Sequence, residues 1–291
     1  MSAPPVPSLI DGLHAIAPGY DALLCDVWGV VHNGRVAFDG VAACLERFRA
    51  ERGPVFLLTN APRPASVLPP QLARIGISEA CYDGIVTSGD ATHFELSRRA
   101  PGVVFHLGPD RDLGLFDGLE LRQTSSVEEA DFVLCSGLRD DVRETPADYQ
   151  DELAAMQALG HTMVCANPDI QVVRGSDLIY CAGALAEAYR AIGGEVAYCG
   201  KPHGPIYDLA MRRIEAVRPG ISRDRVLAVG DGPKTDVRGA NRQGIDCLFI
   251  LGGIHARDMA GKSPSEHRAA LTKLFETERV HAAAVLPSLI W

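Results

Sequence analysis

Four short runs of the chain are apolar over their whole length. They are Ala22–Cys25, Val55–Leu58, Val226–Val229 and Cys247–Leu251. A strand that is covered on both faces carries such a continuous apolar run, whereas a half-exposed strand alternates apolar and polar residues. Amphipathic segments long enough for helices separate these runs. The alternation predicts an α/β fold built on a doubly wound, Rossmann-like parallel sheet.

Two of the intervening helices have clear ends in the sequence. Val41–Ala50 is followed by Gly53-Pro54, and Ile206–Val217 is followed by Pro219-Gly220. Glycine ends helices readily and proline cannot continue them, so both segments are expected to stop at these pairs.

A second series of apolar runs lies between residues 88 and 184. Its members are Val103–Leu107, Phe132–Cys135 and Thr162–Cys165, with a helix-like stretch at Tyr149–Leu159. This series has its own alternation of strands and helices, which indicates a separate α/β domain. We therefore expect a core domain of residues 1–87 and 185–291, interrupted by a smaller inserted domain of residues 88–184.

Polar residues directly follow three of the apolar runs. They are Asp26, the pair Thr59-Asn60 and the pair Gly230-Asp231. In an open α/β sheet, ligands bind beyond the carboxyl ends of the strands. Residues that are far apart in sequence are therefore expected to share one site at this edge.

The segment after Asp26 is suited to a small flap. Gly29 allows the backbone to turn sharply next to the carboxylate. Asn33-Gly34 lies between two β-prone runs and favours a tight hairpin turn. We expect a flap from Gly29 to Phe38 beside the first strand end.

The aspartates at the predicted strand ends suit a hard divalent cation. Magnesium prefers oxygen ligands in octahedral geometry, so Asp26 and Asp231 are candidate ligands, with Asp236 behind them and not in contact with the ion. Two structural alternatives remain open: Asp26 as a turn or helix-capping residue, and Asp236 as the cap of a helix near Val237. Lys201, in Gly200-Lys201-Pro202, would balance the carboxylates and a bound phosphate, or would simply be a solvated lysine.

The ordered series of these motifs resembles the haloacid dehalogenase superfamily, and within it the class IIA, p-nitrophenyl-phosphatase-like enzymes. The resemblance runs from about Tyr20 to Gly253. It includes two short motifs, Ala166-Asn167-Pro168-Asp169 and Gly183-Ala184-Leu185. They are similar to the motifs of that class in the cap domain and at the point where the chain returns from the cap to the core. The inserted domain would then be a C2-type cap that closes over the site and selects the substrate.

The resemblance implies a magnesium-dependent phosphatase acting on a small phosphate monoester, such as a sugar phosphate, nucleotide or cofactor phosphate. Asp26 would form a phospho-aspartyl intermediate, Thr59 would hold a phosphoryl oxygen, and Lys201 would orient and neutralise the phosphate. The magnesium ligands would be Asp26, Asp231 and the backbone carbonyl of Trp28. The other residues expected to bind phosphate or substrate are Trp28, Gly29, Asn60, Asn167 and Asp169.

One residue departs from the family pattern. The family's phosphatases usually carry a second aspartate two positions after the nucleophile, as general acid and base, and this chain has Trp28 there. Loss of such a group typically lowers the rate roughly 10²–10⁴-fold. Three interpretations remain open. The enzyme turns over slowly or uses substrates whose leaving group needs no proton, or another group, such as His32, replaces the acid. In the third interpretation, the protein is catalytically silent and binds phosphorylated metabolites.

Composition narrows the range of partners. The 291 residues are 47% hydrophobic and 22% charged, with a formal net charge of −9, which disfavours nucleic acid and anionic membranes as partners. The eight cysteines are scattered singly and indicate reduced core thiols. The sequence starts without the pattern of a signal peptide and has no run of membrane-spanning length, so a cytoplasmic location is expected.

The expected partner is a small phosphorylated metabolite, and the resemblance also implies a homodimer formed through the cap. Two other nucleotide-binding classes are excluded. The P-loop spacing is absent around Gly232-Pro-Lys-Thr235, and no G-x-G-x-x-G opens a helix after the first predicted strand.

Overall fold

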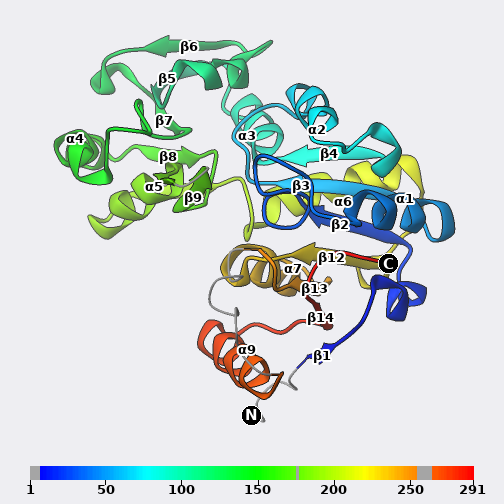
Figure 1. Ribbon diagram of the computed structural model, residues 1–291. Coiled ribbons are helices and arrows are strands. Elements are labelled where there is room, and N and C mark those ends of the chain that lie inside the picture. Colours follow the sequence, from blue (N-terminus) through cyan, green and yellow to red (C-terminus); the bar gives the residue numbers. More distant parts are fainter. Residues whose placement is uncertain (1–6, 175–176, 254–263) are drawn as a thin grey trace. The chain divides into compact units, whose positions relative to one another are not determined.

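The computed structural model describes residues 7–174, 177–253 and 264–291, and its contacts divide the chain into two compact units (Figure 1). The first unit comprises Met1–Thr59, Leu68–Val86 and Tyr207–Trp291. The second comprises Asn60–Val67 and Thr87–Ile206. Each unit is built around its own sheet.

The first unit is organised around a seven-stranded sheet in the order β1-β14-β13-β12-β2-β3-β4. Its strands are β1 (Ser8–Leu9), β2 (Ala22–Asp26), β3 (Val55–Thr59), β4 (Gly84–Thr87), β12 (Val226–Gly230), β13 (Asp246–Ile250) and β14 (Ala284–Leu286). The pairs from β1 through to β3 are parallel. Every residue of β2, β3 and β12 is buried, which explains their uninterrupted apolar sequences. The predicted fold class is confirmed.

Helices flank this sheet (Figure 1). They are α1 (Val41–Glu51), α2 (Pro69–Arg74), α6 (Gly204–Val217), α7 (Arg238–Arg242) and α9 (Pro264–Glu278). Helix α1 buries Val41, Cys44, Leu45 and Phe48, which recur at the three- and four-residue spacing of one helix face. Within the part of the chain that the structure describes, no helix combines the length and the apolar composition needed to cross a membrane.

The second unit contains a five-stranded sheet in the order β11-β8-β7-β5-β6, in which every pair is parallel. Its strands are β5 (Gly102–Leu107), β6 (Leu121–Thr124), β7 (Phe132–Cys135), β8 (Thr162–Cys165) and β11 (Glu195–Tyr198), with a separate antiparallel pair, β9 (Gln171–Arg174) and β10 (Asp177–Tyr180). Its helices are α3 (Ser88–Ser97), α4 (Gln150–Ala158) and α5 (Ala182–Ala191). Met163, Leu185 and Tyr189 belong to its buried core.

The boundaries of the second unit differ from the predicted insertion of residues 88–184. Helix α5 crosses residue 184, and β11 pairs with β8, so the second unit continues to Ile206. β11 is an edge strand that starts with an exposed glutamate, Glu195, and its remaining residues are only partly buried. It therefore lacks the apolar run that identifies the central strands.

The predicted turn at Asn33-Gly34 is present, but the flap is not a two-stranded hairpin. The amide of Asn33 donates to the carbonyl of Val36 at 3.2 Å, and the side chain of Asn33 accepts from the amides of Arg35 and Val36. Gly34 has a φ of +87°. The flanking residues form only isolated bridges, between Trp28 and His32 and between His32 and Ala37.

Candidate active site

Three buried carboxylates meet at the carboxyl end of the sheet of the first unit. β2 ends at Asp26, and Asp231 follows the neighbouring parallel strand β12. Carboxylate oxygens of Asp26, Asp231 and Asp236 lie within 4.8 Å of one another, and each residue is at most 7% exposed. Buried like charges at this separation repel strongly, so a bound cation would stabilise the group. Oxygen donors of this kind suit a hard divalent cation such as magnesium.

Two glycines leave room around Asp231. Gly29 has a φ of +81°, and a Cβ at this position would lie 2.0 Å from Oδ2 of Asp231. A Cβ on Gly253 would lie 1.9 Å from the same oxygen. The backbone of Trp28 and Gly29 therefore runs beside the carboxylate cluster. The sequence offers Gly29 as a turn residue, whereas the close approach of Gly253 becomes visible only in the folded chain.

Asp236 holds the loop that carries Asp231. It lies in a single π-helical turn, Pro233–Val237, and its Oδ2 accepts hydrogen bonds from the amide of Gly232 at 3.0 Å and from the hydroxyl of Thr235 at 3.4 Å. Helix α7 begins at Arg238, with Val237 as its N-cap residue. The hydrogen bonds of Asp236 to Gly232 and Thr235 connect its carboxylate to the loop before the turn.

Thr59 ends β3, the neighbour of β2 on the side away from β12. Asp26 is in register with Leu58, the residue before Thr59. Thr59 is 4% exposed, so its hydroxyl belongs to the same buried edge. The three polar strand ends that the sequence suggested thus occur on three adjacent strands of one sheet.

Four other predicted site residues gather within the second unit. Asn60, which follows Thr59 in the chain, donates from Nδ2 to Oδ1 of Asp169 at 2.9 Å and to the carbonyl of Lys201 at 3.1 Å. Its Oδ1 accepts from the amide of Lys201 at 2.7 Å. Oδ1 of Asn167 accepts from the amide of Asp169 at 3.1 Å. Asn60 thus fixes the backbone of Lys201, a lysine that is only 3% exposed.

The two short motifs of the family resemblance also meet in the second unit. A Cβ on Gly183 would lie 2.2 Å from the carbonyl oxygen of Pro168, and a Cβ on Gly200 would lie 2.6 Å from Cδ of Pro168. Only glycine permits this close packing at residues 183 and 200. These contacts keep the segment from Asn167 to Asp169 against Asn60 and Lys201.

His32 and Trp28 pack together in the flap. Their rings are 5.1 Å apart in an edge-on arrangement, and Nδ1 of His32 accepts a hydrogen bond from the amide of Gly34 at 2.8 Å. Burial lowers the pKa of His32 below its ordinary value. The accepting Nδ1 and the lowered pKa both favour the neutral imidazole, with its proton on Nε2. His32 is therefore poorly suited to replace a general acid.

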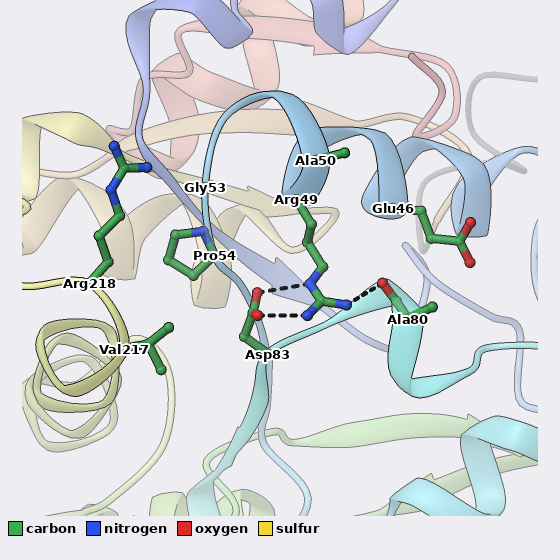
Figure 2. Close-up of a pocket in the computed structure, with 9 residues that line it drawn as sticks. All are labelled: Glu46, Arg49, Ala50, Gly53, Pro54, Ala80, Asp83, Val217 and Arg218. Carbon is green, nitrogen blue, oxygen red and sulfur yellow. Dashed lines mark hydrogen bonds and ion pairs between the residues drawn. The ribbon is translucent and has the colours of Figure 1, made fainter.

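A hollow of about 470 Å³ lies at the opposite edge of the same sheet, beside the residues that precede β3 and β4 (Figure 2). Arg49 lines it but is committed to Asp83, with Nη2 and Oδ1 2.7 Å apart, and to the carbonyls of Glu79 and Ala80. Asp83 also accepts from the amide of Val55, the first residue of β3. These contacts give Arg49 and Asp83 a structural role.

Comparisons with known proteins agree with this architecture. A model of the haloacid dehalogenase-like hydrolases matches residues 23–122, and a HAD-hydrolase-like model matches residues 198–276. A crystal structure of a hydrolase of the haloacid dehalogenase-like family from Brucella suis is 41% identical, with a TM-score of 0.84, and the match covers 97% of this chain and 100% of that one.

Two further similarities involve phosphatases of Mycobacterium tuberculosis. D-glycerol 3-phosphate phosphatase is 28% identical over 84% of this chain and 66% of its own length, just under two thirds. A glycerol phosphate phosphatase solved in complex with magnesium is 25% identical, with a TM-score of 0.65, over 86% of this chain and 73% of that one. The predicted family and the predicted enzyme class, a hydrolase of this type, are confirmed. The chain belongs to the haloacid dehalogenase-like hydrolases.

Proposed function

We propose that the protein is a magnesium-dependent phosphatase that hydrolyses a small phosphate monoester through a phospho-aspartyl intermediate on Asp26. The observation that carries the proposal is the group of three buried carboxylates within 4.8 Å of one another, two of them at the ends of adjacent strands. The sequence match and the structure match to glycerol phosphate phosphatase of M. tuberculosis, the structure being a complex with magnesium, support the same chemistry.

In the proposed reaction, a carboxylate oxygen of Asp26 attacks phosphorus, and the ester P–O bond breaks with its electron pair going to the leaving group. Water then attacks the phosphorus of the intermediate, and the bond to Asp26 breaks to release phosphate. Thr59 holds a phosphoryl oxygen, and Lys201 neutralises its charge. Asp26, Asp231 and the backbone carbonyl of Trp28 would hold magnesium, which when bound offsets the charge of the carboxylates and the phosphate.

We further propose that the second unit is the cap that binds the leaving group, with Asn60, Asn167 and Asp169 orienting the segment around Lys201. The substrate is then a small phosphorylated metabolite. A cytoplasmic location and pairing of two chains through the cap remain predictions, and the second is tested by the mass of the protein in solution.

A second candidate function is recognition of a phosphorylated metabolite without turnover. Trp28 favours it, because indole does not exchange protons with a leaving group or with water. On this account, a phosphorylated ligand would raise the melting temperature of the protein and would remain intact after incubation.

The test of the leading proposal is release of phosphate from p-nitrophenyl phosphate and from a panel of metabolite phosphates that includes glycerol 3-phosphate. We expect release that requires magnesium and that falls roughly 10⁴-fold or more in Asp26→Asn, because the attacking group is lost. Asp39→Asn is the matched control, since Asp39 is an exposed aspartate. Absence of release from every compound by the metal-loaded protein would contradict the proposal and favour the binding function.

A further inference from the structure

Trp28 stands out among the residues next to the carboxylate cluster. It comes two residues after Asp26, and Gly29, the next residue, runs so close to Asp231 that a Cβ would lie 2.0 Å from Oδ2. The three aspartates are nearly completely buried, yet 40% of Trp28 is exposed. Trp28 therefore carries a large, partly exposed aromatic side chain on the backbone segment that runs beside the carboxylate cluster.

The flap fixes the position of this indole. The ring of His32 meets it edge-on, with centroids 5.1 Å apart and an interplanar angle of 67°. A Cβ on Gly34 would lie 2.5 Å from Cη2 and 2.7 Å from Cζ3 of the indole, so the backbone of Gly34 packs directly against the ring. The hydrogen bond from the amide of Gly34 to His32 ties these two neighbours of the indole together. Trp28 is thus held in place before any ligand binds.

The chemistry of indole restricts which substrates suit such a site. Its face stacks on planar aromatic groups, whereas its N–H donates a hydrogen bond but does not release a proton at neutral pH. Trp28 itself therefore supplies no proton to the leaving group, which favours leaving groups that are stable as anions. A phenolate spreads its negative charge over the aromatic ring, whereas an aliphatic alkoxide does not and needs a proton as it leaves.

We propose that Trp28 is the specificity-determining residue of the phosphatase, stacking on the leaving group and favouring phosphate monoesters of phenols over those of aliphatic alcohols. This inference rests on the proposed function. Asp26 forms the new O–P bond, the ester O–P bond breaks, and the phenolate leaves with the electron pair and takes its proton later from solvent. Water then adds to phosphorus, and its protons pass to the released phosphate and to solvent.

The kinetic test separates stacking from the need for a proton. The rates with a series of substituted phenyl phosphates, whose phenols become progressively more acidic, measure the need for a proton. The ratio of the rates with benzyl phosphate and cyclohexylmethyl phosphate measures stacking, because both release an aliphatic alcohol and only the first has an aromatic ring. For the wild type we expect kcat/KM to rise steeply with phenol acidity, and benzyl phosphate to be preferred. Trp28→Leu should reduce that preference roughly tenfold, and Trp28→Phe should retain most of it.

Replacement of the indole by an acid provides the complementary variant. Trp28→Asp should raise the rate with aliphatic phosphates relative to phenyl phosphates by roughly 10²–10⁴-fold, and should flatten the dependence on phenol acidity. The control is Trp291→Phe, because the other tryptophan of the chain packs against Arg47, with the guanidinium 4.9 Å from the ring. This variant should retain the wild-type selectivity.

A binding measurement tests the same contact without turnover. In Trp291→Phe, Trp28 is the only source of indole fluorescence. We expect 4-nitrobenzylphosphonate to quench it in a saturable way and butylphosphonate to leave it unchanged at the same concentration.

The inference is overturned if phosphate is released at similar rates from phenyl and aliphatic esters and Trp28→Leu leaves the benzyl preference unaltered. Absence of saturable quenching by 4-nitrobenzylphosphonate also overturns it. Either result would leave the proposed phosphatase function intact. Absence of phosphate release from all of these esters would instead reject the phosphatase function itself.

Discussion

The two parallel sheets of the chain both carry polar residues at their carboxyl ends, but the two polar groups differ in composition: the first is a cluster of carboxylates, and the second includes amide and hydroxyl side chains. In the first unit, three carboxylates lie within 4.8 Å of one another. In the second unit, most of the polar groups pair among themselves. Asn60 binds Asp169 and the backbone of Lys201, and Nε2 of His106 lies 2.9 Å from the hydroxyl of Ser136.

This difference assigns separate roles to the two edges. A buried cluster of carboxylates favours the binding of a cation, in keeping with the magnesium site that we propose. Hydrogen-bonded side chains at the other edge instead hold the backbone in one conformation. In the function that we propose, the first unit supplies the reacting carboxylate, and the hydrogen bonds of the second unit hold the segment around Lys201 in one conformation.

Within the second unit, the largest expected effect comes from Lys201, a buried lysine. Lys201→Met should lower kcat/KM for p-nitrophenyl phosphate roughly 10²–10³-fold, because the phosphoryl charge loses a positioned cation. Lys273→Met, at an exposed position of α9, is the control and should leave the rate unchanged. A Lys201→Met enzyme as fast as the wild type would show that the second unit contributes no charge to the reaction.

Alanine substitutions at two glycines distinguish the effect of backbone strain from the effect of displacing a carboxylate of the cluster. Gly29 and Gly76 both have positive φ, +81° and +91°, but a Cβ on Gly29 would collide with Asp231, whereas a Cβ on Gly76 would meet nothing within 4 Å. Backbone strain alone should cost each alanine variant about 1 kcal/mol of unfolding free energy, measured by urea denaturation, and Gly29→Ala should lose more because of the collision with Asp231.

The two variants should differ in metal binding. Gly29→Ala should also weaken binding of Mn²⁺, used as a probe for magnesium, by roughly 10–100-fold, because Asp231 is displaced. Gly76→Ala should bind Mn²⁺ as the wild type does. Equal affinities in both variants would contradict the close approach of Gly29 to Asp231.

The smallest expected effect concerns Asp112, a buried residue of the second unit that departs from this pairing. Asp112 is 2% exposed, and neither of its carboxylate oxygens has a hydrogen-bond partner of ordinary geometry in the described chain. Burial raises its pKa, against the opposing influence of Ser136 and Arg111. The ionised carboxylate therefore destabilises the folded state once the pH is above the raised pKa.

Asp112→Asn should accordingly increase the unfolding free energy at pH 8 by about 1–3 kcal/mol. The gain should shrink as the pH is lowered toward the ordinary pKa of an aspartate, because the wild-type carboxyl is then neutral in both states. Asp117→Asn, at an exposed position of the same unit, is the control. A pH-independent gain, or a loss of stability at pH 8, would show that the Asp112 carboxylate is balanced in the folded protein.

The sequence predicts the central parts of both sheets well, for a physical reason. Strands such as β7 and β8 are fully or mostly buried, so their apolar runs mark them over their whole lengths. Edge strands lack this signal: β1 is exposed, and β11 begins with an exposed glutamate. The predicted end of the insertion therefore falls before β11, inside α5.

The candidate site follows the same rule. Asp26, Thr59 and Asp231 are predictable because each directly follows an apolar run, and parallel strands end at the same edge. The approach of Gly253 to Asp231 and the unpaired carboxylate of Asp112 depend on how distant segments pack, which no local pattern indicates. The role of Asp236 in holding the Asp231 loop also depends on the π-helical turn in which Asp236 lies, and no local sequence pattern indicates that turn.

The central claim is that the carboxylates of Asp26 and Asp231 share one divalent cation. The most direct measurement is a titration of the protein with Mn²⁺, with the free ion counted by electron paramagnetic resonance, for the wild type and Asp231→Asn. The account predicts one ion bound per wild-type chain, displaced by magnesium, and an affinity at least roughly tenfold weaker in Asp231→Asn. Equal binding by the two proteins, or no binding by the wild type, would contradict it.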